Sequence, residues 1–164
     1  MKRLDELYDV KLKDPYLDLK QYKDPTICPS CNLIYHNKRW FFDDVEYKFL
    51  VKNNNVTYKK CPACRKIEDN YPLALLEIYK SKLSDIELRD LQNLIKNEVK
   101  NEEGKNPLSR LIKVKEDGDK LIITTTTEFL GKKIAKAIDK TFHGNLHFSF
   151  SNGEKFIRIS WTRS

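Results

Sequence analysis

Two pairs of cysteines with the same spacing are the residues best suited to chemistry. Cys28 and Cys31 enclose a Pro-Ser dipeptide, and Cys61 and Cys64 enclose Pro-Ala. Two intervening residues allow one tight turn to present both sulfurs to the same ion, and two such turns supply the four thiolates of a tetrahedral zinc site. The spacing therefore predicts one structural Zn²⁺, bound by all four cysteines.

Other uses of these cysteines fit the sequence less well. An iron–sulfur cluster also takes four thiolates, but two symmetric pairs around a predicted sheet favour zinc. A redox dithiol needs one pair, usually at the start of a helix in a thioredoxin-like unit, and that context is missing. A catalytic zinc generally keeps an open position and recruits histidine or carboxylate, and we interpret the nearby His36 as a loop or surface residue.

No catalytic residues can be assigned. The three histidines, His36, His143 and His147, are dispersed, and no nucleophile motif surrounds them. The adjacent Asp43 and Asp44 resemble a turn more than an acid/base pair, and there is no glycine-rich loop for a phosphate. We therefore expect a protein that is not an enzyme.

Positive charge is concentrated in two blocks of the chain. The net charge is +7, and residues 28–66 carry +5, residues 67–103 carry −4 and residues 104–164 carry +6. Two blocks of like charge suggest a polyanionic partner, of which nucleic acid is the commonest. The alternative is that the lysines serve only to solvate the surface.

Two groups of basic residues are candidates for contacts with nucleic acid. One group lines the polar face of an amphipathic helix and could follow a phosphate backbone, although it could also be an ordinary solvated face. The other group lies among the cysteines, where cations and aromatic rings could hold unpaired bases, although the aromatics at 40–42 are expected mainly in the core. The candidates are Lys38, Arg39, Lys59, Lys60, Arg65, Lys66, Lys132, Lys133, Lys136 and Lys140.

The elements around the cysteines are predicted to be short strands. Between the two pairs lie several apolar-aromatic runs, with three asparagines at 53–55 suited to a hairpin turn. These runs, which predict two or three strands, are residues 33–35, 40–42, 47–51 and 56–58. The run 73–79 could extend the same sheet. Residues 1–26 contain two Asp-Pro dipeptides and predict a short helix followed by an extended strap.

The rest of the chain predicts helices and hairpins. Ser84 and Glu87 form a capping box that begins a helix from about 85 to 102. Two β-rich runs, 108–116 and 120–126, are joined by Asp-Gly, and a helix at 128–143 should end at Gly144 in the left-handed conformation. Strands at 146–150 and 155–162 follow, joined by a turn at 151–153.

These elements predict an α+β protein. It would comprise an N-terminal zinc ribbon, a connecting helix, and a ββαββ unit with a mostly antiparallel four-stranded sheet covered on one side by helices. We place the strap at residues 1–26, the zinc ribbon at 27–82, and the helix plus ββαββ domain at 83–164.

A cytoplasmic location is expected. No run approaches the roughly 20 apolar residues that span a bilayer, and the first six residues mix both charge signs, unlike a signal peptide. We expect no membrane partner. In a reducing compartment, paired cysteines are more suited to binding a metal than to forming disulfides.

Several motifs resemble a group of small bacterial zinc-ribbon proteins. They are PTICPSC (25–31), YHNKRW (35–40), CPACRKI (61–67), NPLSRL (106–111) and the segment from the threonines at 124–126 to residue 144. That group is similar to the amino-terminal part of the Nmd-three family, archaeal and eukaryotic adaptors that bind the large ribosomal subunit. The adaptors usually carry four Cys-x-x-Cys pairs, whereas this chain has two. The resemblance implies a role near ribosomal RNA, in subunit maturation or quality control.

The sequence therefore predicts a non-enzymatic, zinc-stabilised RNA-binding protein. Its expected partner is RNA, in particular ribosomal RNA, or ribosomal proteins. The alternative is a protein–protein adaptor that uses the zinc ribbon and the basic surface to dock an acidic partner. The oligomeric state is left open.

Overall fold

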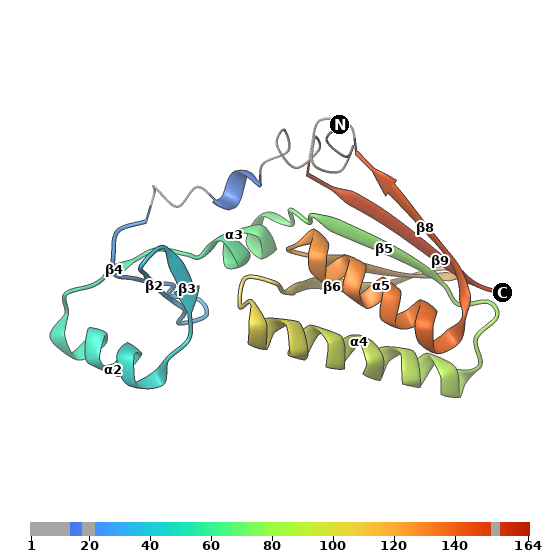
Figure 1. Ribbon diagram of the computed structural model, residues 1–164, viewed down its shortest axis with the longest axis horizontal. Coiled ribbons are helices and arrows are strands. Elements are labelled where there is room, and N and C mark those ends of the chain that lie inside the picture. The colour runs from blue at the N-terminus through green and yellow to red at the C-terminus, as the bar shows by residue number, and fades with distance from the viewer. Residues whose placement is uncertain (1–13, 18–21, 152–154) are drawn as a thin grey trace, which may run out of the picture.

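The computed structural model describes residues 14–17, 22–151 and 155–164. It confirms the α+β class, because these residues form four α-helices and two β-sheets (Figure 1). In chain order the elements are η1 (Pro15–Leu17), β1 (Thr26–Ile27), β2 (Ile34–His36), β3 (Arg39–Phe41), α2 (Asp44–Asn53), β4 (Thr57–Tyr58), α3 (Pro62–Asp69), β5 (Ala74–Tyr79), α4 (Asp85–Lys105), β6 (Leu111–Asp117), β7 (Lys120–Thr125), α5 (Glu128–Phe142), β8 (Gly144–Phe150) and β9 (Ile157–Arg163).

The cysteines lie in a small unit built on a four-stranded sheet. Its strand order is β3-β2-β1-β4, with β1 antiparallel to β2 and parallel to β4. We call residues 22–71 the cysteine unit and the described residues from 73 onward the sheet unit. Much of the strap expected at residues 1–26 lies outside the described residues, and η1 and β1 are its described elements.

The strand predicted at residues 47–51 is wrong, because these residues belong to helix α2. The Asp43 side chain caps this helix by accepting a hydrogen bond of 3.1 Å from the Glu46 N–H. Asn54 ends it in the left-handed conformation at φ 52°. Favourable caps at both ends thus outweigh the β propensity of the residues between them, and the asparagine run closes a helix rather than a hairpin.

The larger sheet has five strands in the order β6-β7-β5-β9-β8, so the prediction of four strands is wrong. The fifth strand is β5, which we expected could extend the cysteine-unit sheet. It lies at the centre, antiparallel to β7 and parallel to β9. Ala74, Leu76 and Ile78 of this strand are fully buried, and a central position buries such a strand better than an edge does. Consequently, the range 27–82 expected for the zinc ribbon includes one strand of the larger sheet.

Helices α4 and α5 cover one face of this sheet (Figure 1). The predicted capping box of α4 is confirmed, since Ser84 and Glu87 exchange side-chain and backbone hydrogen bonds. Gly131 allows α5 to approach β5 closely, because a Cβ there would lie 2.4 Å from the Cβ of Ala74. No helix in the described part of the chain has both the length and the apolar character needed to span a bilayer.

The end of α5 differs from the prediction at one residue. His143, not Gly144, has the positive φ of 52°, and Gly144 begins β8. Glycine is needed there because a Cβ would lie 2.3 Å from the Thr162 carbonyl oxygen. Asp139 Oδ1 secures this corner by accepting hydrogen bonds of 3.1 Å from the Gly144 N–H and from Trp161 Nε1. Part of the turn predicted at 151–153 lies outside the described residues.

Candidate metal centre

The four cysteines meet in one cluster, as predicted. Their sulfur atoms all lie within 4.8 Å of one another, and Cys31 Sγ is 3.7 Å from Cys61 Sγ. Four sulfurs bound at about 2.3 Å in a tetrahedron around zinc would lie about 3.8 Å apart. The cluster is therefore compact enough to hold one metal ion.

The first cysteine pair lies in a tight turn between β1 and β2. The Cys28 N–H donates to the Leu33 carbonyl and its own carbonyl accepts from the Asn32 N–H, both at 2.9 Å. Asn32 has a positive φ of 66°, which asparagine tolerates better than most residues. This turn carries both sulfurs to the same side.

The second pair lies at the start of helix α3. Cys61 is the N-cap, and its sulfur accepts a hydrogen bond of 3.4 Å from the Cys64 N–H. Pro62 occupies the first turn, where its missing N–H costs nothing. The positive end of the helix dipole favours thiolates at this position.

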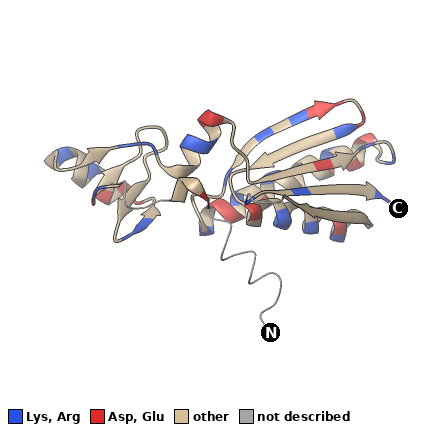
Figure 2. Cartoon of the chain, turned by 90° about the horizontal axis from the view of Figure 1, so that it is seen from above, with Lys and Arg blue, Asp and Glu red and all other residues tan. Residues whose placement is uncertain are grey.

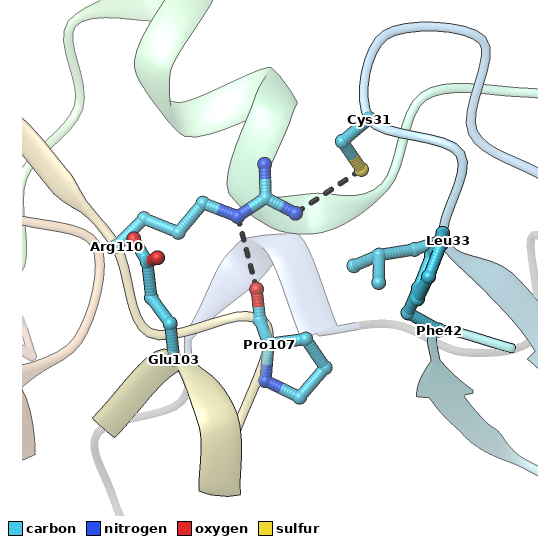
Figure 3. A pocket seen from close by; sticks show the side chains of 6 residues that line it. All are labelled: Cys31, Leu33, Phe42, Glu103, Pro107 and Arg110. Atoms are coloured by element: carbon cyan, nitrogen blue, oxygen red, sulfur yellow. Dashed lines mark hydrogen bonds between the residues drawn. The ribbon is translucent and has the colours of Figure 1, made fainter. Parts of the chain in front are cut away.

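Arg110 is a component of the centre that was not predicted from the sequence. It lies between α4 and β6 and donates to Cys64 Sγ at 3.2 Å, to Cys31 Sγ at 3.1 Å and to Cys61 Sγ at 3.8 Å. Its Nε also donates to the Pro107 carbonyl at 2.9 Å, which orients the guanidinium (Figure 3). Four thiolates and one divalent ion carry a net charge of −2, and this guanidinium offsets part of it.

The electrostatics of the cluster follow from this contact. Burial disfavours the charge of Arg110, but hydrogen bonding and attraction to the sulfurs outweigh burial, and its pKa is raised. Burial, with repulsion from Cys31, raises the pKa of Cys64 to about 11. A metal binds the thiolate, so metal binding must displace protons from such thiols. We therefore expect metal affinity to fall as the pH is lowered.

An open cavity of about 350 Å³ lies beside the centre, where the two units meet. It is lined by Cys31, Leu33, Phe42, Glu103, Pro107 and Arg110 (Figure 3). Cys31 is partly exposed, whereas Cys28 and Cys61 are buried. His36 is engaged away from the cluster, with its Nδ1 2.6 Å from the Asp24 carboxylate.

Lys66 forms a second connection between the units, and its prediction as a contact for nucleic acid is wrong. It is only 2% exposed and forms an ion pair with the equally buried carboxylate of Asp14. Its Nζ also donates to the Thr126 carbonyl at 2.8 Å, in the sheet unit. Because Lys66 lies on the inner face of α3, it is not available to nucleic acid.

The other basic candidates of the cysteine unit lie closer to its surface. Lys38 and Arg39 are exposed, and Arg39 lies 6.0 Å from the Phe41 ring centroid. Lys60 pairs with Glu68. Two further cations lie over tyrosine rings: Lys59 is 5.3 Å from Tyr22, and Arg65 is 5.0 Å from Tyr16. Of the aromatics at 40–42, the first is buried and the last is exposed.

The basic candidates of α5 divide into two kinds. Lys133 pairs with the buried carboxylate of Glu102 on α4 at 3.1 Å, so it serves the contact between the helices. Lys136 and Lys140 are exposed, and Lys132 is partly exposed. Lysine and arginine are spread over both units of the chain (Figure 2).

The contact between Arg110 and the sulfurs predicts a specific defect in metal retention. We expect Arg110→Gln to bind the metal about 10- to 100-fold more weakly, the usual effect of removing a hydrogen-bond partner of a metal ligand. Arg110→Lys should have an intermediate metal affinity. Its ammonium keeps the positive charge but lacks the planar guanidinium, whose separate N–H groups donate to different sulfurs. Metal release to a chromogenic chelator would be followed, with the exposed Arg158→Gln as the control. Equal release from Arg110→Gln and the unaltered chain would contradict this role.

Comparison of the chain with models of protein families, with curated proteins and with solved structures returns no match. The resemblance to the bacterial zinc-ribbon group and to the Nmd-three family therefore stays a prediction. What the structure establishes is a four-cysteine cluster able to hold a metal ion, placed where a small unit meets a five-stranded sheet.

Proposed function

We propose that this chain is a non-catalytic zinc protein that binds RNA, with ribosomal RNA or the large ribosomal subunit as its natural partner. The observation that carries the RNA part is an uneven distribution of charged side chains. Several carboxylates are largely buried in ion pairs, whereas many of the other lysines and arginines are exposed on both units. Such a surface attracts a polyanion even though the chain contains many acidic residues.

Zinc is the ion that fits the cysteine cluster best, and its role is structural. Four thiolates complete a tetrahedron and leave no position for water or substrate, in contrast to catalytic zinc sites. Since iron is also bound by four cysteines, elemental analysis of the purified protein decides between the two metals. The expected result is one zinc per chain, and stoichiometric iron would overturn the assignment.

RNA binding is tested directly with the full chain. Filter binding to fragments of large-subunit ribosomal RNA at 50 and 200 mM salt should show affinity that falls steeply with salt, because neutralised phosphates release counterions. Cofractionation of the protein with ribosomal subunits from cell extracts tests whether the interaction occurs in the cell. Repeating it after nuclease treatment tests whether the interaction requires RNA. Failure to retain any RNA at the lower salt concentration would overturn the proposal.

A protein–protein adaptor is the second candidate, and an exposed apolar patch on α2 favours it. Val45 and Phe49, one helical turn apart, are 79% and 60% exposed, and Phe42 just before the helix is exposed as well. Exposed aromatic residues of this kind are common centres of protein interfaces. Partners that survive nuclease treatment but are lost from a Phe49→Ser variant would favour the adaptor.

A further inference from the structure

We infer that the outer face of α5, together with the end of β8, is a binding surface for single-stranded RNA. This inference rests on the proposed RNA binding and gives it a location and a class of ligand. The surface, which we call the α5 surface, consists of Phe129, Lys132, Lys136, Lys140 and Phe150.

The α5 surface is continuous along the helix. Its four helical residues are spaced by three, four and four positions, so they share one face. The opposite face, with Leu130, Ile134 and Ile138, is fully buried against the sheet. From residue 132 to residue 140 the helix rises about 12 Å, enough to follow a few nucleotides of an extended strand.

Two exposed aromatic rings lie at one end of this surface. Phe129 is 61% exposed and Phe150, from the last position of β8, is 56% exposed. Lys132 connects the helix to β8, because its Nζ lies 5.7 Å from the centroid of the Phe150 ring. Exposed phenylalanine surface is unfavourable in water, but it provides apolar area on which unpaired bases can stack.

The carboxylates of α5 do not neutralise its outer lysines. Glu128 forms an ion pair with Lys155 at 3.5 Å. Asp139 Oδ1 accepts hydrogen bonds from the Gly144 N–H and from Trp161 Nε1 at the end of the helix. Among the residues that the structure describes, Lys132, Lys136 and Lys140 form no ion pair, and the α5 surface therefore keeps three positive charges.

The combination of rings and cations distinguishes a single strand from a duplex. A duplex presents its phosphates but keeps the faces of its bases stacked, so only lysines would contribute to binding it. A single strand offers both groups, and stacking a base on an aromatic side chain contributes about 1–3 kcal/mol. The combination of exposed phenylalanine surface with lysines that form no ion pair among the described residues thus favours the single strand.

Three variants of the full chain separate these contributions. The first, Lys132→Gln/Lys136→Gln/Lys140→Gln, removes the charges, and the second, Phe129→Leu/Phe150→Leu, removes the rings but keeps apolar side chains. The matched control is Lys52→Gln/Lys113→Gln/Lys115→Gln, which removes three exposed lysines elsewhere. Fluorescence anisotropy would measure binding to a labelled 12-nucleotide oligouridine and to a labelled 12-base-pair RNA duplex across a range of salt concentrations. Thermal unfolding would verify that each variant is folded.

We expect the unaltered chain to prefer the oligouridine. The lysine variant should bind it at least tenfold more weakly, with the slope of log affinity against log salt reduced by about 2, or about 0.7 per phosphate contact. The phenylalanine variant should lose about tenfold for the oligouridine with an unchanged salt slope and less than twofold for the duplex. The control should retain most of the affinity.

The contrary outcomes are distinct. If the unaltered chain binds RNA and the lysine variant binds as well as the control, the α5 surface is wrong and the proposed function stands. A preference for the duplex, or a phenylalanine variant that binds oligouridine normally, would overturn the single-strand assignment. If the unaltered chain binds neither RNA, the proposed function itself fails, and the inference fails with it.

Discussion

Cys61→Ser is expected to abolish metal binding and to unfold the cysteine unit while leaving the sheet unit folded. Cys61 is a predicted ligand, the N-cap of α3 and an acceptor from Arg110. The apolar clusters of the cysteine unit are small, and structural zinc contributes about 10–16 kcal/mol of binding free energy in comparable small domains. By contrast, the main core of the sheet unit contains no cysteine.

Two-dimensional amide NMR spectra and metal analysis would measure this effect. Signals from the cysteine unit should collapse to the random-coil region in Cys61→Ser, and a strong chelator should produce the same change in the unaltered chain. Ser30→Ala is the control, because Ser30 is exposed in the turn between Cys28 and Cys31. A cysteine unit that keeps dispersed signals without metal would show that the four thiols are not a structural site.

Lys66→Met is expected to destabilise the protein by about 3–5 kcal/mol, the usual cost of removing one partner of a buried ion pair. The variant leaves the Asp14 carboxylate buried without its counter-charge and the Thr126 carbonyl without the Lys66 donor. Equilibrium unfolding in urea would measure the change. Since Lys66 lies on α3, whose N-cap is Cys61, metal retention should be measured in parallel.

A double variant makes this prediction specific to the ion pair. Asp14→Asn/Lys66→Met removes both charges, so it should recover part of the stability lost in Lys66→Met. Lys60→Met is the matched control, because Lys60 lies in the same unit but pairs with Glu68 at the surface, where an ion pair contributes little. Equal losses in Lys60→Met and Lys66→Met, or no recovery in the double variant, would contradict the buried pair.

One of the connections between the two units runs through the short loop between α4 and β6. Arg110 donates its backbone N–H to the hydroxyl of Thr126 at 2.8 Å, and the Thr126 hydroxyl donates to the Leu108 carbonyl at 2.6 Å. Leu108 packs against the core of the cysteine unit. The guanidinium that contacts the sulfurs is therefore held in place by the edge of the larger sheet, which couples the metal centre to the sheet unit.

Features that depend only on neighbouring residues could be predicted from the amino-acid sequence. The Cys-Pro-small-Cys spacing is a property of one tight turn, so both halves of the metal centre were identified without tertiary information. The capping box at Ser84 is equally local, and the apolar stripe of α5 follows from its 3.6-residue period. The zinc ion and the RNA partner remain predictions.

The burial of long side chains and the central position of one strand depend on contacts between distant parts of the chain. Arg110 is separated from Cys64 by 46 positions, and Lys66 from Asp14 by 52, so no local pattern reveals either contact. The run at 47–51 has β propensity but lies between two helix caps, and β5 pairs with strands far along the chain. The charge of a lysine or arginine does not determine whether its long side chain is buried. Burial depends on which other parts of the chain pack against that side chain after folding.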